Sequence, residues 1–179
     1  MVDLVCLYEE MGRAMLPGPG LSTFLCGLII LSAGREEQKS ELLSRIARGD
    51  LILALALTEP DAAWSSNAWD AEGIMVPAVA DAEEYVIHGT KLFVHDALVA
   101  DKLVCVVRTG NGQDTEEGIS TFLVDTNAPG IRCTPLRTIA GDKQCEVVFD
   151  GVRVSQKDMV GPLHGAWPHV ARAIQHGAV

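Results

Sequence analysis

The residues best suited to chemistry lie at the ends of two apolar segments that have the composition of strands. Thr58 places a hydroxyl at the end of the run 54–60, and Pro60 ends that strand because it lacks an N–H group. Phe93 and His95 place an aromatic ring and an imidazole at the end of the run 91–95. Hydroxyl, backbone N–H and neutral imidazole groups donate hydrogen bonds, and an aromatic ring packs on flat apolar surfaces. If the turn at 58–65 and the strand end at 93–95 converge, they form a shelf for a planar heterocycle.

Other reactive side chains indicate no further site. His164, His169 and His176 have neither a carboxylate nor a cysteine beside them, so the sequence predicts no metal centre. The five cysteines are scattered without a Cys-x-x-Cys pair, which is typical of reduced thiols in apolar positions. A cofactor-free hydrolase using His95 and Asp96 is the weakest hypothesis, because the chain has no Gly-x-Ser-x-Gly motif.

Composition and charge narrow the classes of protein and partner. The chain has 179 residues, which suits about one domain of roughly 100–200 residues. Its formal charge of −10 argues against a nucleic-acid partner, since phosphate binding needs a basic face. The longest apolar stretch, 21–33, is shorter than the roughly 20 residues that span a bilayer, and Asp3 without an early basic residue disfavours a signal peptide. We therefore expect a cytoplasmic protein with no nucleic-acid or membrane partner.

Apolar residues at three- and four-residue spacing predict helices in the N-terminal part of the chain. The first helix ends before the run 17–20, Pro-Gly-Pro-Gly; the second extends from a Ser22 cap to Ala33, and the third from Glu36 to Gly49. The second helix is apolar on every side and must be covered all round. We infer that this chain either lacks neighbouring helices or packs against another subunit.

From position 50 the pattern changes to short strands, with Gly89-Thr90 and Asp150-Gly151 interpreted as two of the turns between them. Many short strands without intervening helices favour a closed or nearly closed antiparallel barrel. The predicted class is α+β, with a helical segment at 1–49, a β-barrel domain at 50–160 and the start of a further helical domain at 161–179. The predicted strands are 51–57, 74–80, 85–88, 91–95, 103–108, 121–125, 131–135, 146–149 and 152–154.

Four groups of segments form a specific pattern by their order and spacing. They are Glu-Glu-Met-Gly-Arg-Ala (9–14) with Glu-Glu-Gln-Lys (36–39); Ala-Leu-Ala-Leu-Thr-Glu-Pro (54–60); Tyr-Val-Ile-His-Gly-Thr-Lys-Leu-Phe-Val (85–94) with Val-Ala-Asp (99–101); and 118–124 with 147–154. Each segment alone is weak evidence. Together they resemble the acyl-CoA dehydrogenase family over nearly the whole chain.

The resemblance implies a helical N-terminal domain, a central β-barrel and a C-terminal four-helix bundle, with this chain holding the end of the first and the start of the third. It implies α,β-desaturation of an acyl-CoA thioester, in which a carboxylate removes the α-proton and FAD accepts the β-hydride. The family's carboxylate comes from the bundle, and no acidic residue follows Gly161, so no catalytic residue is assigned. The implied partners are an acyl-CoA substrate, acyl-CoA dehydrogenase chains in a homo- or hetero-oligomer, and an electron-transfer flavoprotein-type acceptor.

Site residues follow from the resemblance position by position. His95 stands where the family has threonine; it would donate to flavin N5, with Asp96 or Asp101 setting its tautomer, or its larger ring would displace the flavin. Trp64 stands where the family has a serine near the flavin and thioester, so it is the candidate substrate contact, and it either covers an aromatic ring or fills the site. The positions matching the family's FAD contacts are Leu55, Leu57, Thr58, Phe93, Val94 and His95.

Three hypotheses stay open at this point. The first is a truncated flavin-dependent acyl-CoA dehydrogenase, catalytically incomplete by itself; the retained Thr58 and Phe93 favour it. The second is an FAD-deficient partner subunit of a heteromeric acyl-CoA dehydrogenase, which the changes at Trp64 and His95 favour. The third is a non-enzymatic interaction module that keeps the scaffold and has lost the chemistry.

Overall fold

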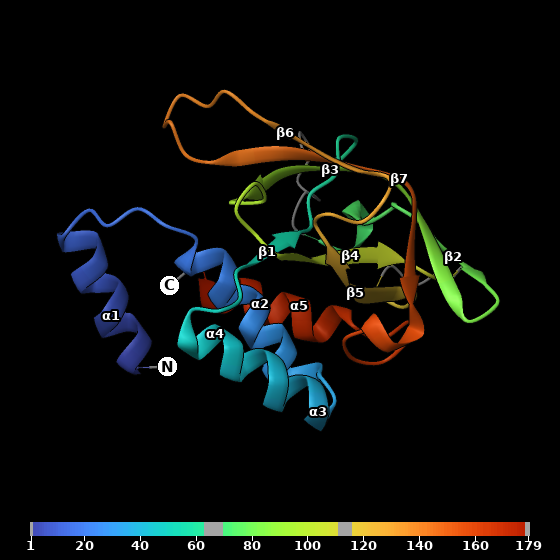
Figure 1. Ribbon diagram of the computed structural model, residues 1–179, viewed down its shortest axis with the longest axis horizontal. Coiled ribbons are helices and arrows are strands. Elements are labelled where there is room, and N and C mark those ends of the chain that lie inside the picture. The colour runs from blue at the N-terminus through green and yellow to red at the C-terminus, as the bar shows by residue number, and fades with distance from the viewer. Residues whose placement is uncertain (1, 63–69, 111–115, 178–179) are drawn as a thin grey trace.

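The computed structural model describes residues 2–62, 70–110 and 116–177, with side chains from residue 5 onward. Helices occupy the two ends of the chain and strands the middle (Figure 1), which confirms the predicted α+β class. The helices are α1 (Val2–Arg13), α2 (Gly20–Ala33), α3 (Glu36–Gln38), the π-helical turn η1 (Lys39–Leu43), α4 (Ser44–Arg48), the 3-10 turns η2 (Ala71–Gly73) and η3 (Gln156–Asp158), and α5 (Trp167–Gly177).

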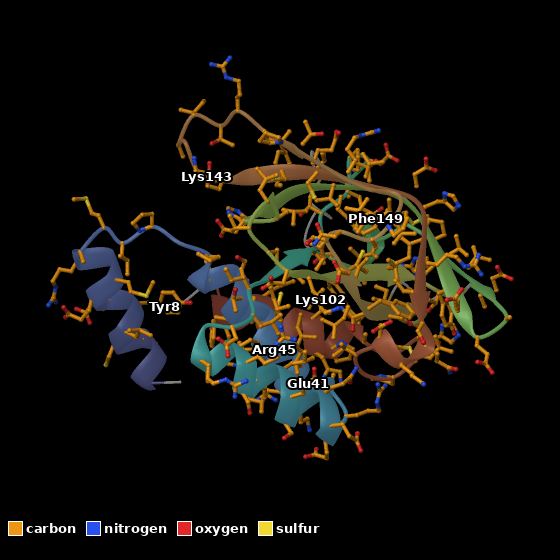
Figure 2. All side chains as sticks on the ribbon, viewed as in Figure 1. Tyr8, Glu41, Arg45, Lys102, Lys143 and Phe149 are labelled. Carbon is orange, nitrogen blue, oxygen red and sulfur yellow. The ribbon has the colours of Figure 1, made fainter. Side chains whose placement is uncertain are left out.

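The strands form two sheets with different topologies. One has the order β1-β4-β5, and the other has the order β2-β3-β7-β6. The strand bounds are β1 (Leu53–Ala56), β2 (Ala78–Asp81), β3 (Glu84–His95), β4 (Lys102–Arg108), β5 (Ile119–Asp125), β6 (Ile131–Pro135) and β7 (Gln144–Ser155). Apolar side chains fill the space between the sheets, among them Phe149 (Figure 2).

The two sheets do not close into the predicted antiparallel barrel. β1 pairs with β4 in parallel, because the chain crosses into the other sheet for β2 and β3 before β4 returns beside β1. Isolated contacts link the sheets, such as the bridge between Pro77 and Arg108 and the hydrogen bond from Leu92 N–H to the Thr58 carbonyl oxygen (2.8 Å). The middle of the chain is therefore a sandwich of one mixed and one antiparallel sheet.

Two predicted turns are wrong, because they lie inside the long strands β3 and β7. Gly89-Thr90 belongs to β3 and Asp150-Gly151 to β7. Ile87 pairs with Val152 but His88 pairs with Asp150, so Gly151 is an extra residue, with φ +68°. A glycine at positive φ suits a β-bulge as well as a turn, so the pattern Asp150-Gly151 did not distinguish between the two.

Helices α2 to α5 lie on one face of the β1-β4-β5 sheet, with α2 packed against both α5 and the edge strand β1, whereas α1 stands apart from the sheet (Figure 1). Ser22 does not cap α2 as predicted; it lies inside the helix, and its hydroxyl donates to the Pro19 carbonyl oxygen (3.3 Å). Part of the apolar surface of α2 stays uncovered, because Leu21 and Leu31 are 48% and 55% exposed. In the described ranges, no helix has both the length and the apolar character to cross a bilayer.

Two glycines at positive φ allow a test of the packing beside β6. Gly130 (φ +90°) lies against β7, where a Cβ would overlap the Asp150 carbonyl oxygen; Gly141 (φ +72°) faces open space. We expect Gly141→Ala to cost roughly 1–2 kcal/mol, the usual cost of left-handed backbone for a residue with a Cβ. Gly130→Ala should cost about 1–3 kcal/mol more through overpacking. Denaturant unfolding measures both, and equal losses would contradict the packing argument.

Candidate functional site

A bulge near the end of β3 turns two consecutive side chains to the same side. Lys91 pairs with Val147 and Val94 with Cys145, so β3 holds one extra residue in this interval. Lys91 and Val94 are 0% and 1% exposed, whereas Leu92 and Phe93 are half-buried and line one cavity. Phe93 takes φ +55° at the bulge. A left-handed backbone at a residue other than glycine costs of order 1–3 kcal/mol and persists only where its surroundings enforce it.

The ends of β1 and β3 meet at this cavity. The hydrogen bond from Leu92 N–H to the Thr58 carbonyl oxygen joins them directly. The cavity has a volume of about 590 Å³, and its lining is mostly apolar. Its lining residues are Gly18, Leu21, Ser22, Leu25, Leu55, Leu57, Thr58, Leu92, Phe93, His95, Asp96, Ile174 and Gly177. Two segments more than thirty positions apart in the sequence thus form one concave surface. Residues 63–65, the rest of the turn in the shelf hypothesis, lie outside the described residues.

Most of the residues assigned to the cofactor share this surface. Leu55, Leu57, Thr58, Phe93 and His95 all line the cavity. Val94 is 1% exposed and belongs to the core between the sheets, so it supports the site from behind instead of lining it. Trp64, the candidate substrate contact, lies outside the described residues.

Sequence reasoning missed the helical wall of the cavity. Leu21, Ser22 and Leu25 of α2 and Ile174 and Gly177 of α5 complete the lining. The two helices approach closely, because a Cβ at Gly177 would lie 2.7 Å from Leu25 Cδ2. The available signal was the all-round apolar character of α2: one side packs on the sheet, and another faces the cavity.

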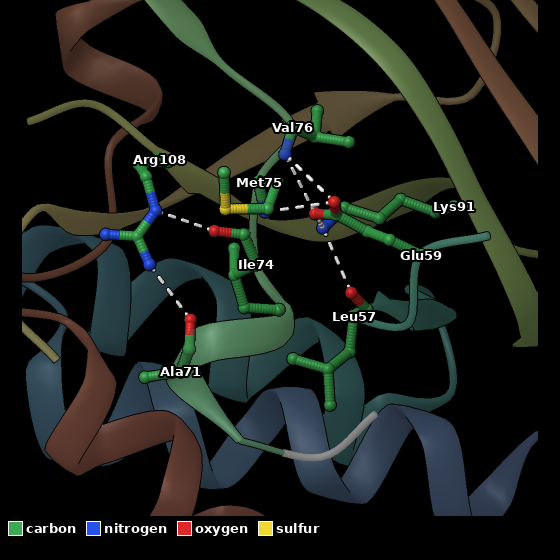
Figure 3. A network of polar contacts seen from close by, with 8 residues as sticks. All are labelled: Leu57, Glu59, Ala71, Ile74, Met75, Val76, Lys91 and Arg108. Atoms are coloured by element: carbon green, nitrogen blue, oxygen red, sulfur yellow. Dashed lines mark hydrogen bonds and ion pairs between the residues drawn. The ribbon is translucent and has the colours of Figure 1, made fainter. Parts of the chain in front are cut away.

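A buried ion pair holds the end of β1 against β3 (Figure 3). Lys91 Nζ lies 2.6 Å from Glu59 Oε1, and the two side chains are 0% and 6% exposed. Lys91 Nζ also donates to the Leu57 carbonyl oxygen at 3.0 Å. The Glu59 carboxylate accepts hydrogen bonds from the backbone N–H groups of Met75 (2.9 Å) and Val76 (3.0 Å). Three segments therefore meet at one pair of charges.

The ion pair has a structural role and leaves Glu59 unsuited to proton transfer. Its carboxylate already receives donors from Lys91 and two backbone amides. Arg108 extends the network by donating to the carbonyl oxygens of Ile74 (2.7 Å) and Ala71 (2.9 Å), which fixes the segment before β2 (Figure 3). The sequence signal for this pair was a lysine and a glutamate inside two otherwise apolar strand ends.

The groups expected to set the His95 tautomer are engaged elsewhere, which corrects that prediction. The Asp96 carboxylate accepts from the Ser22 hydroxyl (3.1 Å), and the Asp101 carboxylate accepts from Ile52 N–H (2.8 Å). The side chain that contacts the imidazole is Gln144 of β7, whose Nε2 lies 3.3 Å from His95 Nε2. Sequence spacing gave no reason to pair residues so far apart.

Three of the five cysteines pack as buried apolar side chains, and none of the five lines the cavity. Each of the five is a free thiol, and Cys26, Cys105 and Cys145 are buried. Burial raises the pKa of Cys105, beside the ion pair, to about 12, so the thiolate is scarce at neutral pH. In the described part of the chain, no group of three or more His, Cys, Asp or Glu side chains is placed to hold a metal ion.

Comparison with known proteins identifies the family. Residues 54–152, more than half of the chain, match the family described as acyl-CoA dehydrogenase, middle domain. The chain belongs to the acyl-CoA dehydrogenase family. It is 31% identical, over 99% of its own length, to the acyl-CoA dehydrogenase FadE26 of Mycobacterium tuberculosis. The chain spans 44% of the length of FadE26.

Solved structures of acyl-CoA dehydrogenases share the fold. The ChsE4-ChsE5 complex from Mycobacterium tuberculosis matches with a TM-score of 0.84 at 30% identity, covering 97% of this chain and 44% of that chain. A glutaryl-CoA dehydrogenase from Mycobacterium smegmatis, in complex with FADH2, matches with a TM-score of 0.70 at 29% identity, covering 85% of this chain and 38% of that chain. The sandwich therefore has the fold of the acyl-CoA dehydrogenase middle domain.

The ion pair predicts a stability difference between buried and exposed charges. Lys91→Met would leave the Glu59 carboxylate buried without its cation, and we expect a loss of about 3–5 kcal/mol in the free energy of unfolding. The matched control is Arg153→Met, which breaks the exposed pairs with Asp81 and Glu84 and should cost far less, because solvent screens exposed ion pairs. Urea titration compares the two, and similar losses would show that the buried pair does not anchor the site.

Proposed function

We propose that this chain holds the isoalloxazine ring of FAD in an acyl-CoA dehydrogenase that introduces an α,β double bond into an acyl-CoA thioester. The observation that carries the proposal is the convergence of Leu57-Thr58 and 92–95 on one cavity of about 590 Å³. Small-molecule sites usually have volumes of about 300–1,000 Å³, apolar linings and a few polar groups. The cavity has these properties.

The lining fits the flavin ring. Leu55, Leu57, Leu92 and Phe93 provide apolar and aromatic surface for a flat heterocycle. Thr58 and His95 provide hydrogen-bonding groups at the ends of the two strands. When bound, FAD would supply the hydride acceptor, which no protein side chain provides.

The residues of this chain would orient the reactants and exclude water, and the proton-accepting carboxylate would come from outside it. Of the acidic residues at or next to the cavity, Glu59 is saturated by Lys91 and backbone amides, and Asp96 accepts from Ser22. The α-proton is weakly acidic, so hydrogen bonds to the thioester carbonyl are also required. An electron-transfer flavoprotein-type acceptor is part of this proposal, because the reduced flavin must be reoxidised.

A flavin titration tests the proposal. Phe93→Leu keeps an apolar side chain but removes the aromatic face. We expect FAD binding to weaken about two- to twelvefold, as loss of about 0.5–1.5 kcal/mol implies. The control is Phe24→Leu on α2, where the ring contacts Tyr8 and does not line the cavity. Quenching of flavin fluorescence gives both affinities. A chain that binds no flavin, or an equal effect of the two substitutions, would contradict the proposal.

A second candidate is a subunit that depends on a partner chain to complete its FAD site. None of the described lining residues is lysine or arginine, and Asp96 adds a negative charge. The pyrophosphate of FAD is anionic and is normally matched by cations or helix N-termini. The first turn of α2 does line the cavity, but the Asp96 carboxylate lies against it and already accepts from the Ser22 hydroxyl. The similar ChsE4-ChsE5 structure is a complex of two different chains. In this alternative, a second acyl-CoA dehydrogenase chain would supply the pyrophosphate contacts.

Riboflavin distinguishes the two candidates, because it has the ring of FAD without the pyrophosphate. If this chain contributes only the ring site, riboflavin and FAD should bind with similar affinity, within about threefold, and salt should have little effect. Co-expression with a partner should then increase the affinity for FAD alone. FAD binding that is far tighter than riboflavin binding in the isolated chain would exclude the partner-dependent alternative.

A further inference from the structure

His95 lies at the cavity, directly opposite Gln144 in the ladder between β3 and β7. Gln144 Nε2 approaches His95 Nε2 at 3.3 Å. The two strand ends are fixed against each other, because Asp96 N–H donates to the Lys143 carbonyl oxygen at 2.7 Å. The contact between the amide and the imidazole therefore sits on a defined backbone frame.

The orientation of the Gln144 amide follows from its contact with Asp142. Its Nε2 also contacts the Asp142 carboxylate, which in turn accepts from the Thr138 hydroxyl. A carboxylate has no hydrogen to donate, so the NH2 group of the amide must face Asp142. The Thr138 and Gln144 hydrogen bonds lower the pKa of Asp142, which keeps the carboxylate ionised and the amide in this orientation.

The amide decides which ring nitrogen of His95 carries the hydrogen. One N–H of Gln144 serves Asp142, and the other is directed at His95 Nε2, which must accept it. A neutral imidazole that accepts at Nε2 carries its hydrogen on Nδ1. The ring can then offer an Nδ1–H donor to a ligand in the cavity.

We propose that Gln144 is a positioning residue: backed by Asp142, it holds His95 as the neutral Nδ1–H tautomer, so that the ring presents a hydrogen-bond donor to the cavity ligand. The identity of that ligand as a flavin rests on the proposed function. The tautomer itself does not, because Gln144, Asp142 and Thr138 fix it within the protein.

The tautomer is measured on the full 179-residue chain without flavin. In ¹⁵N-labelled protein at about pH 8, above the usual histidine pKa of about 6.5, the ring nitrogen shifts of His95 report which nitrogen is protonated. Wild-type protein should show Nδ1–H. Gln144→Glu replaces the donor by an acceptor and should reverse the tautomer to Nε2–H. Gln144→Leu removes the amide that contacts His95 and should give a mixture of the two tautomers. This variant provides the test if the glutamate variant does not fold.

Gln156→Glu in η3 is the control, since it makes the same charge change at an exposed position and should leave His95 unchanged. FAD titration of the same proteins should show about three- to tenfold weaker binding for Gln144→Glu, which corresponds to about 0.7–1.4 kcal/mol for one hydrogen bond, and no change for Gln156→Glu. An Nε2–H wild type, a tautomer insensitive to Gln144, or unchanged FAD affinity in Gln144→Glu would overturn the inference. A chain that binds no flavin but shows the expected tautomers would overturn the proposed function alone.

Discussion

The geometry of the cavity depends on the buried pair of Lys91 and Glu59. An isolated charge in this position would cost several kcal/mol, so each residue requires the other. Their hydrogen bonds reach Leu57 at the end of β1 and the backbone of Met75 and Val76 before β2. The pair thereby sets the distance between two sheets that share few backbone hydrogen bonds. A hydrophobic pair of similar volume would fill the space but would not fix the direction of the chain beyond Thr58.

The bulge that follows Lys91 places the next side chains of β3 on the surface of the cavity. In a regular strand, Leu92 and Phe93 would point to opposite faces. The extra residue lets both line the cavity, while Lys91 and Val94 stay in the core. The left-handed backbone of Phe93 is stabilised by the fixed contacts on either side of it. Local strain is thus stored where the aromatic ring faces the cavity.

The charges around the cavity suit the flavin ring of the proposed cofactor but not its pyrophosphate. Around the strand ends, the lining is apolar with a few neutral hydrogen-bonding groups, which suits a flavin ring. The described lining has no lysine or arginine to meet a pyrophosphate, and the chain as a whole carries a formal charge of −10. The two proposals are therefore compatible. This chain would bind the flavin ring, and a partner chain would supply the cations for the pyrophosphate.

The sequence by itself determined the α+β order of elements, the family, and the five assigned residues that meet at the cavity: Leu55, Leu57, Thr58, Phe93 and His95. The order of elements follows from periodicity and turn residues, which act over a few positions. The family and the five residues follow from short motifs that resemble those of the acyl-CoA dehydrogenases. The sheet topology, the merging of strands through bulges and the helical wall of the cavity were decided by packing between distant segments. The pairing of Lys91 with Glu59 and of His95 with Gln144 also depended on the tertiary structure. These residues are far apart in the sequence and meet only because particular strands become neighbours in the fold. Local sequence patterns do not specify which strands become neighbours.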